Sequence, residues 1–117
     1  MNNSGLVSVV IPSHNNGAFV PQAIESVLAQ SYRHHEILVV DDGSTDDTRE
    51  TLKPYRDKIT YIFQDNRGPA VARNQGIRHS RGAYIAFLDA DDVWLEDKLD
   101  RQMQFFREHK DVGLVFG

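Results

Sequence analysis

Three carboxylates follow an apolar segment in the later part of the sequence. Residues 84–88 read Tyr-Ile-Ala-Phe-Leu, and Asp89, Asp91 and Asp92 come directly after them. Like charges this close are unfavourable unless a cation or hydrogen-bond donors compensate them. Because Mg²⁺ and Mn²⁺ prefer hard oxygen ligands, we interpret Asp91, with Asp89 beside it, as a candidate metal site. The alternative is that one aspartate caps the next helix and the others are solvated loop residues.

Polar residues also follow three other apolar segments. Residues 12–16 come after the segment 6–11, Asp41 and Asp42 after 36–40, and residues 65–68 after 59–63. In an open parallel sheet, ligands bind beyond the carboxyl ends of the strands, where the strand order reverses. We therefore expect all four clusters to meet at one edge of a sheet and to form a single site.

Each cluster carries a side chain or backbone feature suited to a nucleotide. Asp41 or Asp42 can accept hydrogen bonds from a base or a ribose, although an Asx-turn before Gly43 is the alternative. The helix start around Pro69 offers backbone N–H groups to a phosphate. Arg73 adds a positive charge that can bridge phosphate oxygens, unless it only forms a surface salt bridge.

Strands and short-looped helices alternate along the chain. We predict an α/β fold, Rossmann-like, with a mostly parallel, doubly wound sheet that has helices on both faces. Ser44 or Thr45 can cap the second helix, and Asp92 the last one. The expected strands are 6–11, 36–40, 59–63, 84–88 and 112–116, and the expected helices are 19–30, a short one after 45, 69–79 and 95–108.

Composition restricts the function classes. The 117 residues suit one domain, with a net charge of −4 and no cysteine, so a disulfide framework and a thiolate zinc site are excluded. Scattered basic residues give no nucleic-acid footprint, and no apolar stretch approaches a membrane span. The five histidines lack metal-site spacing and are expected on the surface or in turns. The chain ends on an apolar strand, from which we expect a domain truncated at its C-terminal end. The polar first residues lack a signal-peptide pattern, from which, with the missing membrane span, we expect a cytoplasmic location.

Four motifs together resemble a known family. Residues 7–15 give a strand with a Pro-Ser-x-Asn loop, and residues 36–46 read E-I-L-V-V-D-D-G-S-T-D. Residues 66–76 read N-x-G-x-x-x-A-R-N-x-G, and residues 82–92 read G-x-Y-I-A-F-L-D-A-D-D. In this order and spacing, the chain resembles the nucleotide-binding part of the family-2 inverting glycosyltransferases, which have the GT-A fold.

The resemblance implies a nucleotide-diphospho-sugar donor, often a UDP-sugar, and an Mg²⁺ or Mn²⁺ cofactor. By position, Asp42 contacts the base, Arg73 lies near the diphosphate, and Asp89 and Asp91 form the metal-binding D-x-D motif. His14 stands where the family commonly has an aromatic residue such as tyrosine. The donor-binding residues implied are Pro12, Ser13, Asn15, Asp41, Asp42, Asn66, Gly68, Arg73, Asp89 and Ala90.

The implied reaction is metal-assisted sugar transfer with inversion, in which a carboxylate base deprotonates an acceptor hydroxyl. The family's base lies in its later half, so we expect it beyond Gly117 together with the binding region for a glycan or lipid-linked acceptor. The chain alone is then expected to bind the donor without transferring the sugar. Wall, capsule or surface-glycan synthesis at the inner face of the membrane is the implied setting.

Three other classes of α/β protein fit the motifs less well. A phosphoacceptor receiver domain, the main alternative, needs an acid pair after its first strand, where this chain has Pro12, Ser13 and His14. A dinucleotide-dependent dehydrogenase needs G-x-G-x-x-G at the same place. A sugar nucleotidyltransferase typically has a glycine-rich basic loop there, and this loop is also missing.

Overall fold

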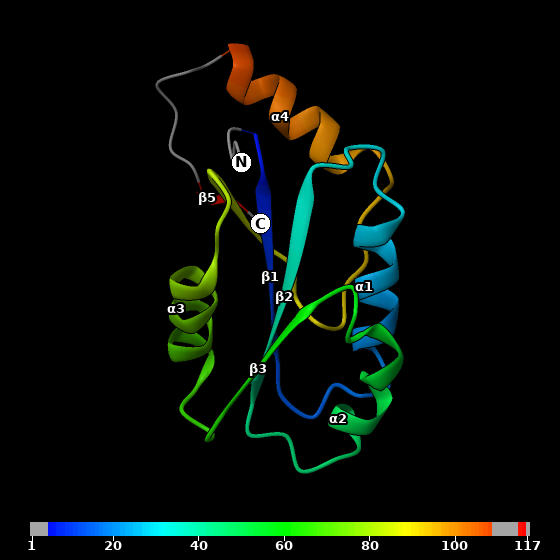
Figure 1. The fold of residues 1–117 in the computed structure, drawn as a ribbon, viewed down its shortest axis with the longest axis vertical. Helices are drawn as coiled ribbons and strands as arrows, with labels where there is room; N and C mark the ends of the chain where they lie inside the picture. The colour runs from blue at the N-terminus through cyan, green and yellow to red at the C-terminus, as the bar shows by residue number, and fades with distance from the viewer. Residues whose placement is uncertain (1–4, 109–114, 117) are drawn as a thin grey trace.

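The computed structural model describes residues 5–108, 115 and 116. Five parallel strands form one sheet in the order β3-β2-β1-β4-β5 (Figure 1). This confirms the predicted α/β fold with its parallel sheet. The elements in chain order are β1 (Val7–Ser13), α1 (Val20–Leu28), β2 (His35–Asp42), α2 (Thr48–Thr51), the 3₁₀ helix η1 (Lys53–Tyr55), β3 (Thr60–Gln64), α3 (Pro69–His79), β4 (Tyr84–Phe87), α4 (Lys98–Glu108) and β5 (Val115–Phe116).

Strand β1 lies at the centre of the sheet and is buried on both faces. Its alternate residues Val7, Val9 and Ile11 pack into the larger apolar core, whereas Val10 packs into a smaller core on the opposite face. A nearly continuous run of β-branched residues suits this position, because both faces of a central parallel strand are covered. The sequence pattern of residues 6–11 therefore predicted both the strand and its place in the interior.

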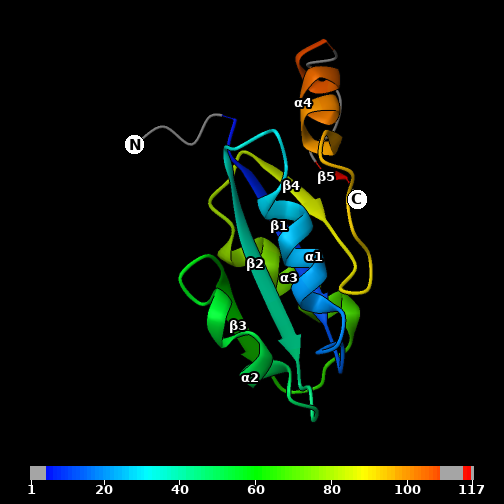
Figure 2. The same ribbon diagram turned by 90° about the vertical axis from the view of Figure 1, so that its right-hand side faces the viewer.

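Helices cover both faces of the sheet (Figures 1 and 2). Helices α1 and α4 contribute to the larger core, α1 through Val20, Ile24 and Val27. On the opposite face lies α3, whose buried residues are only Ala72 and Gly76. The small side chains of α3 allow its backbone to approach the sheet closely, which brings the start of this helix near the ends of β1 and β2.

The strand order reverses beside β1. The chain runs from β1 to β2 and β3 on one side, and then α3 carries it back so that β4 pairs with β1 on the other side. This reversal is the place where open α/β sheets bind ligands, beyond the carboxyl ends of the strands. The residues that follow β1 and β4 lie on either side of this point.

The prediction for the last helix was wrong at its start. Helix α4 begins at Lys98 instead of Leu95, and the side chain of Leu95 is 75% exposed. Asp92 is therefore too far away to cap α4. A buried amide just after α1 replaces it, since the Leu99 N–H donates to Oε1 of Gln30 at 3.0 Å.

The prediction for the second helix also needs correction. Helix α2 is a single turn, and neither Ser44 nor Thr45 caps it. Instead, Oδ1 of Asp46 accepts hydrogen bonds from the backbone N–H and the hydroxyl of Thr48. The last expected strand, 112–116, is present as β5, while its residues before Val115 lie outside the described part of the chain.

Candidate functional site

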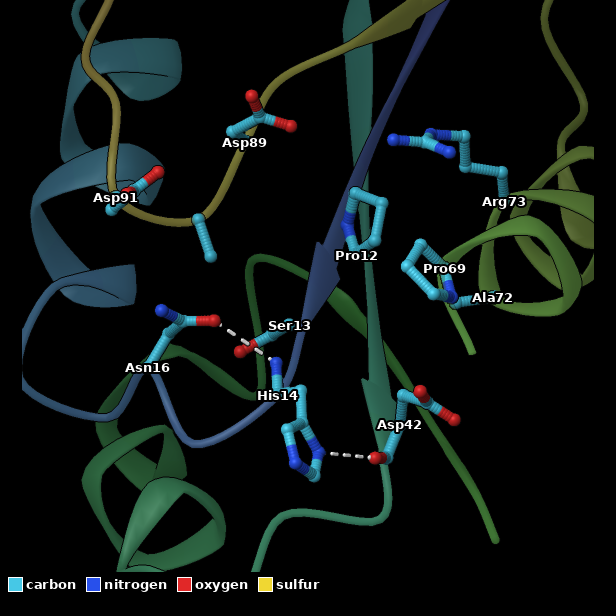
Figure 3. Close-up of a pocket in the computed structure, with 11 residues that line it drawn as sticks. Pro12, Ser13, His14, Asn16, Asp42, Pro69, Ala72, Arg73, Asp89 and Asp91 are labelled. Carbon is cyan, nitrogen blue, oxygen red and sulfur yellow. Dashed lines mark hydrogen bonds between the residues drawn. The ribbon is translucent and has the colours of Figure 1, made fainter. Parts of the chain in front are cut away.

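A pocket of about 280 Å³ lies at the carboxyl ends of the strands, at the predicted edge of the sheet (Figure 3). It brings together the end of β1, the end of β2, the first turns of α3 and the segment after β4. Its lining residues are Pro12, Ser13, His14, Asn16, Asp42, Pro69, Ala72, Arg73, Asp89, Ala90 and Asp91.

The structure divides the predicted site residues into two groups. Seven of them line the pocket: Pro12, Ser13, Asp42, Arg73, Asp89, Ala90 and Asp91. The others lie outside the lining: Asn15, Asp41, Asn66 and Gly68. Hydrogen bonds connect Asn15, Asp41 and Gly68 to the loops that shape the pocket.

The two sides of the pocket carry opposite charges. Asp89 and Asp91 lie on one side and Arg73 on the other, with Pro12 between them (Figure 3). A phosphate group is attracted to the arginine side, and a cation to the aspartate side. A metal-bound polyphosphate needs both kinds of contact at once.

The aspartate cluster has the donor chemistry of a site for a hard cation. Asp89, Asp91 and Asp92 can each offer one oxygen atom, and these atoms lie within 4.8 Å of one another. Within residues 5–108, no salt bridge neutralises these three carboxylates. Oxygen-only ligation with open positions is what Mg²⁺ and Mn²⁺ require when substrate phosphates complete the coordination. The residues present therefore fit such an ion.

Asp42 connects the end of β2 to the start of α3. Its Oδ1 accepts hydrogen bonds from the side-chain amide of Gln64 at 2.8 Å and from the N–H of Arg67 at 2.7 Å, and its Oδ2 accepts from the N–H of Gly68 at 3.0 Å. Burial alone would raise the pKa of Asp42, but these donors outweigh it and hold the pKa below its ordinary value of 3.8. Asp42 is therefore an ionised carboxylate at neutral pH.

These bonds change the interpretation of the α3 start. The sequence suggested that backbone N–H groups near Pro69 are free for phosphate, yet the N–H groups of Arg67 and Gly68 already bind Asp42. An internal carboxylate thus takes part of the place that an external anion would occupy at a helix N-terminus. Arg73, one turn into α3, remains as the pocket's positive side chain.

Asp41 is not among the residues that line the pocket, and it is 1% exposed. Its Oδ1 accepts from the Ser44 N–H at 2.9 Å, and its Oδ2 accepts from the Tyr61 hydroxyl at 2.5 Å. The Tyr61 ring lies under the guanidinium of Arg56, 4.4 Å from its centroid. Asp41 thus supports the turn after β2, through an N–H three residues on rather than the two of an Asx-turn.

Four lining residues are not among the predicted site residues: His14, Asn16, Pro69 and Ala72. Nδ1 of His14 lies 2.7 Å from the carbonyl oxygen of Asp42, and the His14 N–H donates to the Asn16 amide oxygen at 3.0 Å. The expectation that every histidine lies on the surface or in a turn is also wrong for His35, whose ring nitrogens are buried. His109 lies outside the described residues.

The fold and the pocket define an open parallel α/β domain with a charged pocket at its switch point, and sequence comparison identifies its family. The sequence profile of "Glycosyl transferase family 2" matches residues 8–117. The chain therefore belongs to glycosyl transferase family 2, as the four motifs predicted. This membership also argues against a phosphoacceptor receiver domain.

Named relatives agree with this family. A Bacillus subtilis (strain 168) protein, provisionally named the teichuronic acid biosynthesis glycosyltransferase TuaG, is 44% identical over 88% of this chain. TarS of S. aureus, solved in complex with UDP-GlcNAc, is 28% identical over 89% of this chain, with a TM-score of 0.78. The Pyrobaculum calidifontis mannosyltransferase PcManGT, in complex with GDP-Man and Mn²⁺, is 26% identical over 86%, with a TM-score of 0.77. The fold matches the GT-A fold of these structures.

The chain spans less than half of the length of these proteins. It covers 42% of TuaG and 32% of each of the two solved chains. Within the residues that the structure describes, no helix is both long and apolar enough to cross a membrane.

Proposed function

We propose that this chain holds the nucleotide-diphospho-sugar donor of a glycosyltransferase. The observation that supports this most strongly is the pocket in which Asp89 and Asp91 lie opposite Arg73 at the switch point of the sheet. A nucleoside diphosphate with a bound cation complements this charge arrangement. The family membership and the nucleotide complexes of TarS and PcManGT support the same conclusion.

In this proposal Asp91 and Asp89 hold Mg²⁺ or Mn²⁺, and Asp92 stands beside them. A bound ion would neutralise charge on the departing nucleoside diphosphate. Arg73 approaches the same diphosphate from the other side and supplies charge-assisted hydrogen bonds. The mannosyltransferase PcManGT, with Mn²⁺ in its complex, supports divalent metal use in this fold.

The nucleoside lies at the other end of the pocket, beside His14 and Asp42. A carboxylate has about four lone-pair positions, and neighbouring donors occupy three of them on Asp42. One position remains, on Oδ2. The single imide N–H of uracil needs one acceptor, whereas the adjacent N1–H and N2–H of guanine need two. We therefore propose a UDP-sugar as the donor, as in the TarS complex with UDP-GlcNAc.

The transfer step needs a base that the pocket does not supply in this proposal. Asp42 is committed to its own donors, and Asp89 and Asp91 to the ion. We place the carboxylate base, and the binding region for a glycan or lipid-linked acceptor, in a part of the protein outside residues 1–117. Attack on the face of the sugar opposite to the diphosphate then inverts the anomeric centre. Residues 1–117 are one donor-binding domain within that protein.

Calorimetry with UDP tests the proposal. We expect UDP to bind in the presence of Mn²⁺ or Mg²⁺ and to lose most of its affinity when the metal is chelated. The physical reason is that the diphosphate would otherwise lie against two uncompensated carboxylates. Tight binding of UDP without a divalent ion would contradict the proposed role of the aspartates.

Two variants of the aspartate cluster refine the test. Asp91→Asn removes a proposed ligand and should weaken metal-dependent UDP binding by at least tenfold, a typical loss when a charged hydrogen-bond or ligand partner is removed. Asp92→Asn makes the same change in charge one residue away and should have a much smaller effect. Equal losses in both variants would mean that the cluster acts only through its net charge.

A further inference from the structure

Asn15 lies between two residues that line the pocket, yet it does not line the pocket itself. His14 and Asn16 both contribute to the lining, whereas the Asn15 side chain binds the loop that follows β2. Asn15 also has a φ of 53°, and among the described residues it is the one non-glycine residue with a positive φ. Asparagine tolerates this left-handed conformation better than most residues.

The Asn15 amide joins two loops that are about thirty residues apart in sequence. Its Oδ1 accepts hydrogen bonds from the backbone N–H groups of Thr45 at 2.8 Å and Asp46 at 3.2 Å. The backbone N–H of Asn15 donates to the hydroxyl of Ser44 at 2.9 Å. One side chain in a special backbone conformation therefore satisfies two consecutive donors of the neighbouring loop.

The same residue contacts the ring of His14. A carbonyl oxygen only accepts hydrogen bonds, so Nδ1 of His14 carries a proton where it meets the Asp42 carbonyl at 2.7 Å. In the neutral ring, Nε2 is then an acceptor, and Nδ2 of Asn15 lies 3.5 Å from it. Asn15 thus lies against the free edge of the ring while the Asp42 carbonyl holds the other edge.

From these contacts we propose that Asn15 is a positioning residue for donor binding. It acts through His14 and Asn16 by fixing the loop after β1 against residues 44–46. This inference rests on the proposed function, because holding His14 in place helps only if the pocket binds the nucleoside. A preorganised side chain does not lose conformational freedom when the nucleotide binds, so affinity increases without a direct contact.

Three substitutions separate the roles of the amide and the backbone. Asn15→Gly keeps the positive φ without strain and removes only the amide. Asn15→Asp keeps an acceptor for Thr45 and Asp46 and also tolerates the left-handed conformation. Asn15→Ala removes the amide and adds strain. We expect N15G to weaken Mn²⁺-dependent UDP binding about tenfold, N15D at most about threefold, and N15A at least as much as N15G.

A second measurement follows the histidine ring directly. Two-dimensional ¹⁵N–¹H spectra of the imidazole distinguish the Nδ1–H tautomer from the Nε2–H tautomer. We expect His14 to be in the Nδ1–H form in the parent chain and to become a mixture of tautomers in N15G. In N15D, a carboxylate oxygen that can only accept replaces Nδ2, so we expect a proton on Nε2 to be favoured there. Thermal unfolding of each variant checks that the fold is retained, since a purely structural effect would lower stability without changing the tautomer.

The outcomes distinguish this inference from the proposed function. If the parent chain binds UDP and N15G binds it equally well with His14 still in the Nδ1–H form, the positioning role is wrong. If the parent chain does not bind UDP under any metal condition, the proposed function fails, and the positioning role fails with it. Weaker binding in N15G together with a changed His14 tautomer supports the inference.

Discussion

Gly76 of α3 lies directly against Val10 of β1. A Cβ atom built on Gly76 would be 2.3 Å from Cγ1 of Val10, far closer than van der Waals contact allows. Gly76 therefore sets the distance between α3 and the sheet. Arg73 lies one turn earlier on the same helix and lines the pocket, so this contact also sets how far Arg73 stands from the ends of the strands.

We expect Gly76→Ala to destabilise the chain by about 1–3 kcal/mol, the usual cost of overpacking a core. The sign of this change in stability is informative, because helix propensity alone would favour alanine over glycine by about 1 kcal/mol. Urea unfolding gives the change in free energy of unfolding.

The exposed Asn74→Ala substitution on the same helix is the control for Gly76, and it should be neutral or slightly stabilising. Replacing Val10 by alanine in the G76A background should make the double variant more stable than the sum of the single effects predicts. Additive effects would show that the two residues do not contact each other in solution.

Local sequence patterns were sufficient to predict the strands and the first helix. The β-branched run before Pro12 predicted the central strand, and Val20, Ile24 and Val27 predicted the buried face of α1. These patterns record burial, which every residue in a repeating element shares. The start of α4 was not predictable in this way, because it depends on Gln30, 69 residues before Leu99.

The sequence predicted the edge of the sheet at which the pocket lies, but it did not show which side chains face the pocket. Asp41 and Asp42 are neighbours of the same type, and only Asp42 lines the pocket. Tyr61 binds one of these carboxylates and Gln64 the other, and this choice follows from the pairing of β2 with β3. Such contacts between loops and strands leave no local pattern in the sequence.

Gln30 is fully buried and holds the segment between the aspartate cluster and α4. Its amide nitrogen donates to the Leu95 carbonyl at 2.6 Å, and its amide oxygen accepts from the Leu99 N–H at 3.0 Å. Gln30→Leu would leave both backbone groups without these partners. The Leu95 carbonyl would still accept from the Lys98 N–H at 3.1 Å, so the Leu99 N–H is the group left unsatisfied. We expect a loss of about 1–3 kcal/mol in the free energy of unfolding, the cost of one unsatisfied buried group.

Gln104→Leu is the matched control for Gln30. Gln104 lies on the exposed side of α4, and its amide makes only a 3.4 Å contact with Glu108. Urea unfolding should therefore show little change for Q104L. Comparable stability of Q30L and Q104L would contradict the role assigned to the buried amide.

His35 should make stability depend on pH. Burial, followed by the nearby charge of Arg33, holds the pKa of His35 below its ordinary value of 6.5 in the folded chain. Below pH 6.5 the unfolded chain binds a proton at this position that the folded chain resists, so stability decreases as the pH falls from 7 to 5. His35→Phe removes the titrating group and should give a flatter dependence of unfolding free energy on pH.

His79→Phe is the comparison for His35, because the His79 side chain is exposed and bonds only to the Gln75 carbonyl among the described contacts. H79F makes the same substitution at an exposed position, so its unfolding free energies at pH 7 and pH 5 measure what the change of side chain does apart from burial. An unchanged pH response in H35F would mean that His35 titrates alike in the folded and unfolded chains.

Gln64 should determine which nucleobase the pocket accepts, because it occupies one lone-pair position on Oδ1 of Asp42. Gln64→Leu frees that position next to the one that remains on Oδ2. Two acceptors side by side match the N1–H and N2–H of guanine. We expect the ratio of GDP to UDP affinity, measured by calorimetry with Mn²⁺, to rise about tenfold, the value of one additional hydrogen bond to a charged group.

The ratio of the two affinities separates recognition from stability. A general loosening of the pocket in Q64L would weaken UDP and GDP alike and leave the ratio unchanged, and that result would contradict the specificity role of Gln64. Gln22→Leu, on the exposed side of α1, makes the same change in side chain away from Asp42 and should alter neither affinity. Under the proposed function, we therefore expect selectivity for uracil to depend on Gln64, a residue outside the lining, because its amide limits the hydrogen bonds that Asp42 can still accept.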